Sequence, residues 1–247
     1  MRVSPSGKAQ ASQACIRGFE SRHPLHIFSE AISMKFKALI FDLDGTLLNT
    51  LADMVVVTNK ALASVGYPER TEQDILSYIG NGGLRLVQQA VPEDASPSIV
   101  DHVYETWKML YAAYGDQQTK VYPGMAQALE GLKAAGVKLG VLSNKNDRLV
   151  HMLIEKHLPG YFDVVHGERK GVPRKPDPAG LLACIEELGL NKDEVAYVGD
   201  SQPDVLAASS GGVYLIGVSW GFGGSEFRAD PRIDTLIQSP KELLDLV

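Results

Sequence analysis

The chain has 247 residues, of which 45% are hydrophobic and 22% are charged, and its formal net charge is −6 at pH 7. These values are typical of a globular protein and exclude a disordered or fibrous chain, and no apolar run approaches the roughly 20 residues that cross a bilayer. The acidic balance argues against binding to a nucleic-acid backbone, which usually requires a basic excess. Cys15 and Cys184 make no disulfide framework and are typical of a reducing, cytoplasmic compartment.

The first 33 residues differ from the rest of the chain. They contain four basic and two acidic residues and show little hydrophobic periodicity, whereas a strongly patterned segment begins just after Met34. Three interpretations are open: an upstream extension before a natural start at Met34, a Ser-rich transit-like leader, or a helix near Ile27–Ile32. We favour the first, and we expect residues 1–33 to be a non-native or poorly ordered leader outside the folded protein.

The first predicted strand, Lys37–Phe41, is mostly apolar and leads directly into the acidic pair Asp42 and Asp44. Residues two apart on an extended segment point to the same side, so both carboxylates can reach one reacting centre. Gly45 permits a turn that a residue with a Cβ would resist. An Asp-Gly turn alone is common in loops, but two acids at the end of a buried strand favour a catalytic or binding role.

Residues 51–120 have a different hydrophobic pattern, because most of them follow a helical period and no apolar run among them indicates a buried strand. We therefore predict a helical cap over residues 51–120, inserted after the first strand of a core that is formed by residues 34–50 and 121–247. The helical patterns within the cap are Asp53–Val65, Glu72–Ile79, Leu84–Ala90 and Ser98–Tyr114.

A glycine-rich turn at Gly80–Gly83 precedes Arg85 in the third of these helical patterns. Arg85 is a candidate for binding a carboxylate of the substrate, although an exposed arginine on a helix surface is the simpler interpretation. The turn does not have the G-x-G-x-x-G spacing of a dinucleotide-binding loop, and Gly221–Gly224 lacks this spacing too. A nicotinamide-dependent dehydrogenase therefore has little support.

After the cap, short apolar runs alternate with helical patterns, which is typical of a parallel α/β sheet. We predict an α/β fold with a three-layer Rossmann-like core around a central parallel sheet. Ligands of such sheets bind outside the carboxyl ends of the strands, so the polar clusters that follow the strands are expected to meet in one site. The apolar runs are Val137–Leu142, a weaker one around Val164 and Val165, Val195–Val198 and Val213–Val218.

Ser143 and Asn144 follow one of these strands, and Lys175 lies in a loop. A hydroxyl and an amide at a strand end can bind phosphoryl oxygens, but the same residue types are common helix N-caps. The segment Lys175–Pro178 contains two prolines, which hold it extended before a helix predicted at Ala179–Leu188. A lone loop lysine is usually a solvated charge, whereas a fixed lysine suits a phosphoryl group.

Asp200 and Asp204 follow the strand Val195–Val198 and join Asp42 and Asp44 at the same predicted edge of the sheet. Four nearby carboxylates raise one another's pKa when nothing compensates their charge. A bound hard cation relieves this repulsion, and Mg²⁺ is expected because it uses a few carboxylates together with phosphate and water. Ser201 can also cap a helix whose dipole Asp204 complements, and the two roles are compatible.

These four clusters, in this order, resemble the haloacid dehalogenase superfamily of phosphohydrolases, and the resemblance covers Lys37 to the C-terminus. The superfamily patterns are D-x-D-G-T, a Ser/Thr motif, a lysine and G-D-x-x-x-D. They are met by Asp42–Thr46, Ser143, Lys175 and Gly199–Asp204.

In detail the chain is most similar to the phosphoglycolate phosphatases of this superfamily. One departure is Asn49, which stands where many relatives have Asp but lies outside the catalytic residues. The segments that carry the similarity are Ile79–Leu84, Tyr122–Gly124, Ser143–Lys145, Lys175–Pro178 and Trp220–Gly223.

The resemblance implies a Mg²⁺-dependent phosphatase of small phosphate monoesters, with 2-phosphoglycolate as the leading candidate substrate. It implies that Asp42 is the nucleophile and forms an aspartyl-phosphate, that Asp44 is the general acid and base, and that Lys175 is the third catalytic residue. The cap would close over the site and select the leaving group.

The resemblance also implies which residues bind the metal and the phosphoryl group. Mg²⁺ would be held by the Asp42 carboxylate, the Asp44 main-chain carbonyl and Asp200, with Asp204 and Ser201 supporting these ligands. The phosphoryl oxygens would be bound by Gly45, Thr46, Ser143, Asn144 and Lys175.

Two alternatives stay open. The same chemistry serves a sugar phosphomutase or an inorganic pyrophosphatase of this superfamily, and a non-catalytic binding or regulatory protein can use the same fold. The presence of both acids of the D-x-D pair argues against the non-catalytic alternative. As partner we expect a small phosphorylated metabolite, with neither nucleic acid nor membrane, for a chain that is a monomer or a homodimer.

Overall fold

The computed structural model of the chain describes residues 36–247. The predicted leader, residues 1–33, therefore lies outside the described residues, as do the three interpretations of it.

A six-stranded parallel sheet forms the centre of the core, with the strand order β5-β4-β1-β6-β7-β8. The first strand in the chain occupies an inner position, so its carboxyl end lies between those of β4 and β6. The strands are β1 (Ala38–Phe41), β4 (Lys138–Asn146), β5 (Val164–Glu168), β6 (Val195–Gly199), β7 (Tyr214–Val218) and β8 (Thr235–Ile237).

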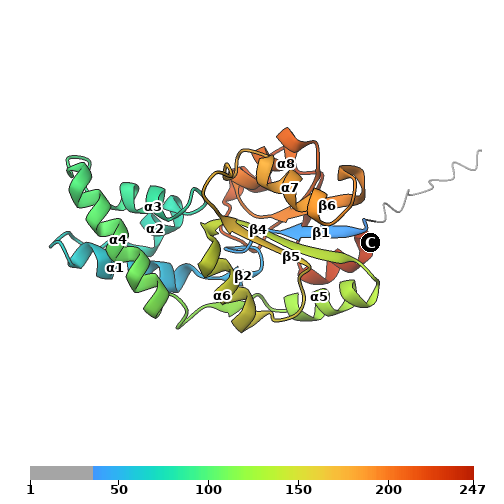
Figure 1. The fold of residues 1–247 in the computed structure, drawn as a ribbon, viewed down its shortest axis with the longest axis horizontal. Coiled ribbons are helices and arrows are strands. Elements are labelled where there is room, and N and C mark those ends of the chain that lie inside the picture. Colours follow the sequence, from blue (N-terminus) through green and yellow to red (C-terminus); the bar gives the residue numbers. More distant parts are fainter. Residues whose placement is uncertain (1–35) are drawn as a thin grey trace, which may run out of the picture. The chain divides into compact units, whose positions relative to one another are not determined.

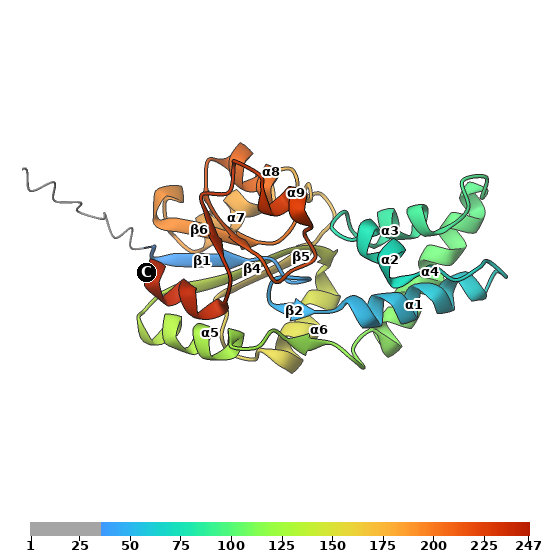
Figure 2. The ribbon, with the colours of Figure 1, turned by 180° about the vertical axis from the view of Figure 1, so that it is seen from behind.

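Helices cover both faces of this sheet, with α5 and α6 on one side and α7 and α8 on the other (Figure 1). A short 3₁₀ turn near the C-terminus, η2, lies beside α5 (Figure 2). These elements are α5 (Met125–Ala134), α6 (Asp147–His157), α7 (Ala179–Glu187), η1 (Lys192–Glu194), α8 (Gln202–Gly211), α9 (Ser225–Arg228) and η2 (Pro240–Leu246).

The side chains of β1 show why the sheet has a core on each face. Leu39 and Phe41 pack into the apolar cluster under α5 and α6, whereas Ala38 and Ile40 pack into the one under α7 and α8. This alternation follows from the two-residue period of a strand, and a parallel strand buried on both faces is apolar throughout. The predicted α/β fold, a three-layer Rossmann-like core with a helical insertion after the first strand, is confirmed.

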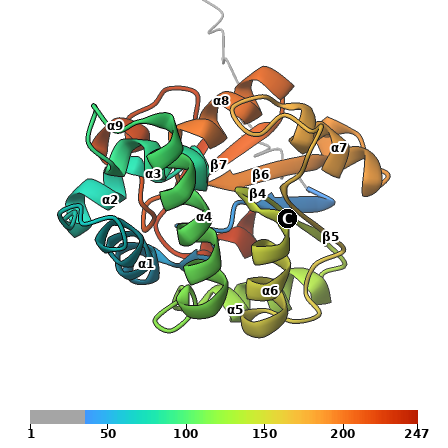
Figure 3. The ribbon, with the colours of Figure 1, turned by 60° about the vertical axis from the view of Figure 1, so that its left-hand side comes forward.

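Four helices follow β1 and gather into a separate apolar cluster (Figure 3). Their large buried side chains include Trp107 and Tyr111, and the indole of Trp107 donates a hydrogen bond to Thr58 across the cluster at 3.1 Å. We keep the proposed cap boundaries of residues 51–120 for this unit. The helices are α1 (Leu51–Ala63), α2 (Glu72–Tyr78), α3 (Gly83–Ala90) and α4 (Pro97–Tyr114).

A two-stranded antiparallel ribbon joins the cap to the core, formed by β2 (Leu48–Asn49) and β3 (Lys120–Val121). Asp53, in the first turn of α1, accepts hydrogen bonds from the main-chain N–H groups of Gln117, Gln118 and Thr119, at distances from 2.6 to 3.2 Å. The segment that leaves the core and the segment that returns to it are therefore tied together.

Two features of the sheet differ from the sequence prediction. β4 continues to Asn146, four residues past the predicted end, because its last residues pair with β5 after an irregularity in register. The short strands β2, β3 and β8 were not predicted, since two or three residues carry no periodic signal. Over residues 36–247, no helix combines the length and the apolar character needed to cross a membrane.

Candidate active site

A cavity of about 540 Å³ lies where the carboxyl ends of β1, β4 and β6 face the cap. The cap side is largely apolar and includes Met54, Leu76, Leu86 and Trp107 beside the glycine-rich turn. The core side carries the polar groups that the sequence placed after separate strands. These are Asp42, Asp44, Ser143, Asn144, Lys145, Lys175, Asp200 and Ser201.

Asp42 sits at the end of β1 and is 7% exposed. Its Oδ1 lies 3.0 Å from the Nζ of Lys175, an ion pair without the geometry of a hydrogen bond, and within residues 36–247 this oxygen has no hydrogen-bond partner. Burial raises the pKa of Asp42 to about 7, against the opposing charge of Lys175. A buried carboxylate oxygen that is free of hydrogen bonds can attack an electrophile without first breaking any.

Asp204, at the start of α8, is completely buried, and both of its carboxylate oxygens accept hydrogen bonds from protein groups. Its Oδ1 accepts from Lys175 at 2.7 Å and lies 2.9 Å from the Tyr197 hydroxyl. Its Oδ2 accepts from the main-chain N–H groups of Asp200 and Ser201 and from the Ser201 hydroxyl, at 2.6 to 3.2 Å. Asp204 therefore orients Lys175 and the loop after β6.

Asp200 is also completely buried, but from residues 36–247 it accepts only one hydrogen bond on each oxygen. Thr46 donates from its hydroxyl at 2.9 Å, and the main-chain N–H of Phe222 donates at 2.6 Å. Gly45 has φ +89°, and a Cβ there would lie 2.3 Å from the Asp200 Oδ2. The D-x-D-G-T turn needs glycine at this point because Asp200 packs directly against it.

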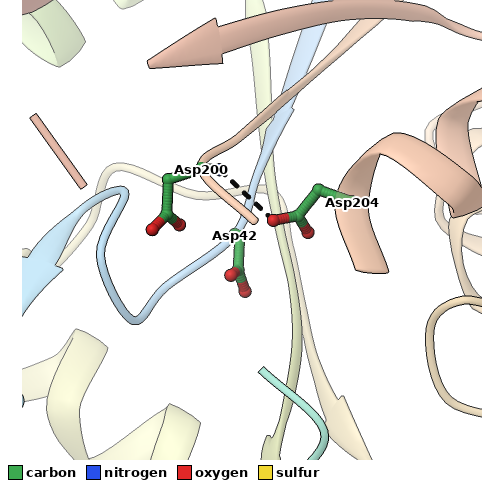
Figure 4. Close-up of side chains that lie close together, drawn as sticks. All are labelled: Asp42, Asp200 and Asp204. Carbon is green, nitrogen blue, oxygen red and sulfur yellow. Dashed lines mark hydrogen bonds between the residues drawn. The ribbon is translucent and has the colours of Figure 1, made fainter. Parts of the chain in front are cut away.

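The three carboxylates Asp42, Asp200 and Asp204 form an acidic cluster (Figure 4), and each offers an oxygen that lies within 4.8 Å of the others. Burial raises the pKa of Asp200 well above its ordinary value, and the charges of Asp204 and Asp42 add to the rise. This donor set fits a hard cation bound by oxygen ligands. Because both oxygens of Asp204 already accept hydrogen bonds from protein groups, Asp42 and Asp200 fit as direct ligands of the cation. Asp204 fits as a residue that holds these ligands in place.

The side chain of Asp44 points to a different set of partners. Lys145, in β4, donates to both of its carboxylate oxygens at 2.9 and 3.0 Å, and the Thr50 hydroxyl donates to Oδ1 at 2.7 Å. Lys145 is 6% exposed. Burial alone lowers the pKa of Lys145, but the Asp44 carboxylate outweighs it and leaves this pKa above its ordinary value. Lys145 and Asp44 therefore form an ion pair between a buried ammonium and a partly buried carboxyl group.

Ser143 and Asn144 both lie at the cavity, but their polar atoms are used differently. The Ser143 hydroxyl oxygen accepts a hydrogen bond from the Lys145 main-chain N–H at 3.2 Å. The Asn144 amide donates to the carbonyl oxygens of Gly80 in the cap and Lys175 in the core, at 2.9 and 2.8 Å. In this structure the Asn144 side chain therefore connects cap and core, and its predicted contact with a phosphoryl group stays a prediction.

Arg85 is not among the residues that line the 540 Å³ cavity. It is exposed on α3, donates weakly to Gln88 at 3.4 Å and borders a separate, open hollow on the surface. Among the candidate residues, Lys175 lines both this hollow and the main cavity, whereas Arg85 lines the hollow alone. Asn49, the departure noted in the sequence, accepts from the Leu51 main-chain N–H at 3.3 Å at the start of α1.

Sequence reasoning gave no role to three residues that hold the charged groups in place. These are Lys145, Thr50 and Tyr197, which contact Asp44 or Asp204. Lys145 directly follows Ser143 and Asn144, so its position beside a motif was a usable signal. Thr50 and Tyr197 carried no such signal, because a threonine before a helix and a tyrosine in a strand are ordinary structural residues.

Residues 39–218 match the model of a family described as haloacid dehalogenase-like hydrolase. The chain is 32% identical over 218 residues to a phosphoglycolate phosphatase of Vibrio parahaemolyticus, a match that covers 85% of this chain and 96% of that protein. It is also 32% identical over 213 residues to phosphoglycolate phosphatase 1 of Pseudomonas aeruginosa, covering 84% of this chain and 78% of the relative.

A solved structure shows the same similarity in three dimensions. The crystal structure of a predicted phosphoglycolate phosphatase from Haemophilus somnus superposes with a TM-score of 0.81 at 29% sequence identity, covering 85% of this chain and 97% of the other. The match spans both the sheet and the inserted helices, since it includes most of the described residues.

Proposed function

The chain belongs to the haloacid dehalogenase-like hydrolase family, as a phosphoric monoester hydrolase, and we propose that its cavity hydrolyses small phosphate monoesters through a phosphorylated Asp42 with Mg²⁺ as cofactor. The observation that carries this proposal is the free Oδ1 of Asp42, buried at the end of β1 and 3.0 Å from the Lys175 ammonium. The Asp42 side chain lines the cavity, and two further carboxylates, Asp200 and Asp204, lie close to it in a cluster that a cation would neutralise.

In the first step, an Asp42 oxygen attacks phosphorus and the bond from phosphorus to the leaving oxygen breaks. Asp44 in its protonated form gives that proton to the leaving oxygen, so an alcohol departs, and the proton that Asp44 takes from water in the second step restores this form. Lys175 offsets the charge of the transferring phosphoryl group, and the Ser143 hydroxyl binds one of its oxygens. We assign Gly45, Thr46 and Asn144 to the same binding turn through their places around Asp42 and Lys175.

In the second step, the Asp44 carboxylate takes a proton from water, which attacks the phosphorus of the aspartyl-phosphate. Inorganic phosphate leaves and Asp42 returns as a carboxylate. Mg²⁺ would be held by the Asp42 carboxylate, the Asp44 main-chain carbonyl and Asp200, and when bound it neutralises the crowded acids and the phosphoryl oxygens. Asp204 and Ser201 keep the loop that carries Asp200 in place.

The leading candidate substrate is 2-phosphoglycolate, because the relatives that align over about 85% of this chain are named phosphoglycolate phosphatases. The partner in this proposal is a small phosphorylated metabolite. For the assembly we keep the expectation of a monomer or a homodimer, which light scattering measures.

Phosphate release from a panel of monoesters, with Mg²⁺ and with a chelator, tests the proposal. We expect Mg²⁺-dependent turnover that is highest on 2-phosphoglycolate and is lost in Asp42→Asn. Acid quenching of the wild type during turnover should also yield a peptide that is phosphorylated on Asp42. Asp101→Asn, an exposed acid on α4, is the matched control and should keep full activity. Robust turnover by Asp42→Asn would refute the nucleophile, and an isomerised sugar phosphate in place of free phosphate would identify a mutase.

A further inference from the structure

Two buried lysines pair with three of the four carboxyl groups of the site. Lys175 pairs with Asp42 and Asp204, and within the described residues Lys145 pairs with Asp44. The family resemblance gave Lys175 a role but gave none to Lys145. Because burying an ammonium costs several kcal/mol unless it is well paired, the second lysine needs a reason of its own.

The contacts of Asp44 restrict its carboxylate to one orientation. Lys145 bridges both oxygens at 2.9 and 3.0 Å, and Thr50 donates to Oδ1 at 2.7 Å. A carboxylate held on both oxygens cannot rotate about its Cβ–Cγ bond without breaking at least one charge-assisted hydrogen bond. Lys145 and Thr50 reach Asp44 from different elements, β4 and the residue before α1.

Tyr111 covers the Lys145 ammonium from the cap. The centre of its ring lies 4.4 Å from Nζ, within the range of a cation–π interaction. Tyr111 belongs to α4 and is completely buried, and its hydroxyl has no hydrogen-bond partner among residues 36–247. The ring of Tyr111 thus lies over the ammonium, and Lys145 lies between a cap helix and a carboxylate of the core.

We propose that Lys145 is a positioning residue that orients Asp44, and that the Tyr111 ring holds Lys145 in this place. The proposal rests on the proposed function, in which Asp44 protonates the leaving oxygen. It links the orientation of this acid to the seating of α4, so the cap contributes to catalysis through Lys145 without touching the reacting atoms.

The alternative is that Lys145 serves only to neutralise a buried charge. Leaving-group dependence separates the two, because kcat/KM covers the steps up to departure of the leaving group. The alkoxide of 2-phosphoglycolate needs a proton from Asp44, whereas the phenolate of 4-nitrophenyl phosphate leaves without one. A misplaced acid therefore slows the first ester much more than the second.

We expect Lys145→Met to lower kcat/KM for 2-phosphoglycolate about 100-fold, since a general acid contributes about 10²–10⁴, and for 4-nitrophenyl phosphate less than about tenfold. KM for 2-phosphoglycolate should change little, because Asp44 acts on the chemical step. Lys145→Arg should recover part of the loss, since a guanidinium also binds both carboxylate oxygens. Tyr111→Leu should give the same pattern at smaller size, and Tyr111→Phe, which keeps the ring, should lose less than Tyr111→Leu.

Lys138→Met is the matched control, because Lys138 lies at the exposed start of the same strand. Circular dichroism and thermal melting check that each variant is folded. If Lys145→Met does not fold, Tyr111→Leu and Lys145→Gln carry the same comparison. Equal losses on the two esters in an active enzyme would overturn the positioning role alone. A wild type that is inactive on both esters would overturn the proposed function, and this inference with it.

Discussion

The Nζ of Lys175 and the Oδ1 of Asp204 lie 2.7 Å apart, with side chains that are 3% and 0% exposed. Lys175 also faces Asp42 at 3.0 Å, so one ammonium serves two buried acids. Burial by itself lowers the pKa of Lys175, and the charges of Asp204 and Asp42 raise it above its ordinary value. This lysine therefore carries its charge between the two acids.

Lys175 is the lysine that pairs with Asp42 and Asp204 in the acidic cluster, whereas Lys145 pairs with Asp44. Replacing Lys175 by methionine should therefore leave the cluster without this cation. We expect Lys175→Met to lower the free energy of unfolding by about 3–5 kcal/mol, as for other broken buried pairs, and to lower kcat at least about 100-fold. Mg²⁺ should then raise the melting temperature of the variant more than that of the wild type, because it takes over the neutralisation.

Thermal melting with and without Mg²⁺ measures this difference. Lys170→Met, an exposed lysine in the loop that leads to Lys175, is the matched control and should respond to Mg²⁺ as the wild type does. A Mg²⁺ effect on Lys175→Met that is no larger than on the wild type would show that Mg²⁺ does not take over the neutralisation that Lys175 provides.

Asn144 makes two hydrogen bonds that connect the glycine-rich turn of the cap to the loop of Lys175. Asn144→Ala removes both, so the main chain around Gly80 should open more often. We expect amide exchange in residues 79–83 to become about fivefold faster, which corresponds to about 1 kcal/mol for a lost hydrogen bond. Hydrogen exchange followed by mass spectrometry measures this change.

Asn59→Ala is the matched control for that experiment. Asn59 also makes two hydrogen bonds, but both go to Arg70 inside the cap. It should leave exchange in residues 79–83 unchanged. If both variants accelerate exchange at the turn equally, the effect comes from loosening of the cap and not from its contact with the core.

Asp53 ties the returning segment of the cap to α1 through the main-chain N–H groups of Gln117, Gln118 and Thr119. Asp53→Ala leaves these donors without their acceptor. We expect the free energy of unfolding to fall by about 3 kcal/mol and the melting temperature by about 6–12 °C. Calorimetry measures the shift, with the exposed Asp101→Ala as control. An unchanged melting temperature would mean that water replaces the carboxylate at no cost.

Cys184 packs in the cluster under α7 and α8, and burial raises the pKa of its thiol to about 12, with Glu187 adding to the rise. Because the thiolate is the reactive form, Cys184 should react with a disulfide reagent at pH 8 only as fast as the protein unfolds. Since the pKa is higher in the folded state, the stabilisation is complete below pH of about 9 and is lost as the pH rises toward 12.

The chain has two cysteines, so the Cys15→Ser variant leaves Cys184 as the thiol that is measured. Its absorbance change with the reagent should be slow in buffer and immediate in denaturant. Immediate reaction of one thiol in buffer would contradict the burial of Cys184.

The fold and the acids of the site could be predicted from local patterns. Apolar runs followed by polar clusters indicate buried parallel strands, and the carboxyl ends of such strands meet at one edge. For this reason Asp42, Asp44, Asp200 and Asp204 were expected together. Three of them form one cluster, whereas the Asp44 side chain pairs with Lys145. The helical insertion was equally readable, because a 3.6-residue period over many turns is a strong signal.

Contacts between side chains of distant segments could not be predicted from the sequence. The hydrogen bond from the Asn144 amide to Gly80 of the cap was not foreseen, and the predicted contact of Asn144 with a phosphoryl group stays a prediction. Arg85 was a candidate for the substrate, but it lies on an exposed face of α3 away from the main cavity. Neither outcome follows from spacing along the chain, because each depends on how the cap packs on the core.

Local patterns along the chain were enough to predict the order of the longer strands and helices, the position of the candidate acids at strand ends and the helical insertion, since these depend on hydrophobic period and turn chemistry. The choice of cation for each acid depends instead on packing in three dimensions. Lys175 contacts Asp204 and Lys145 contacts Asp44, because the packing of β4, the loop before α7 and cap helix α4 brings these side chains within hydrogen-bond distance. Such pairings are set by three-dimensional distance, which a one-dimensional pattern does not contain.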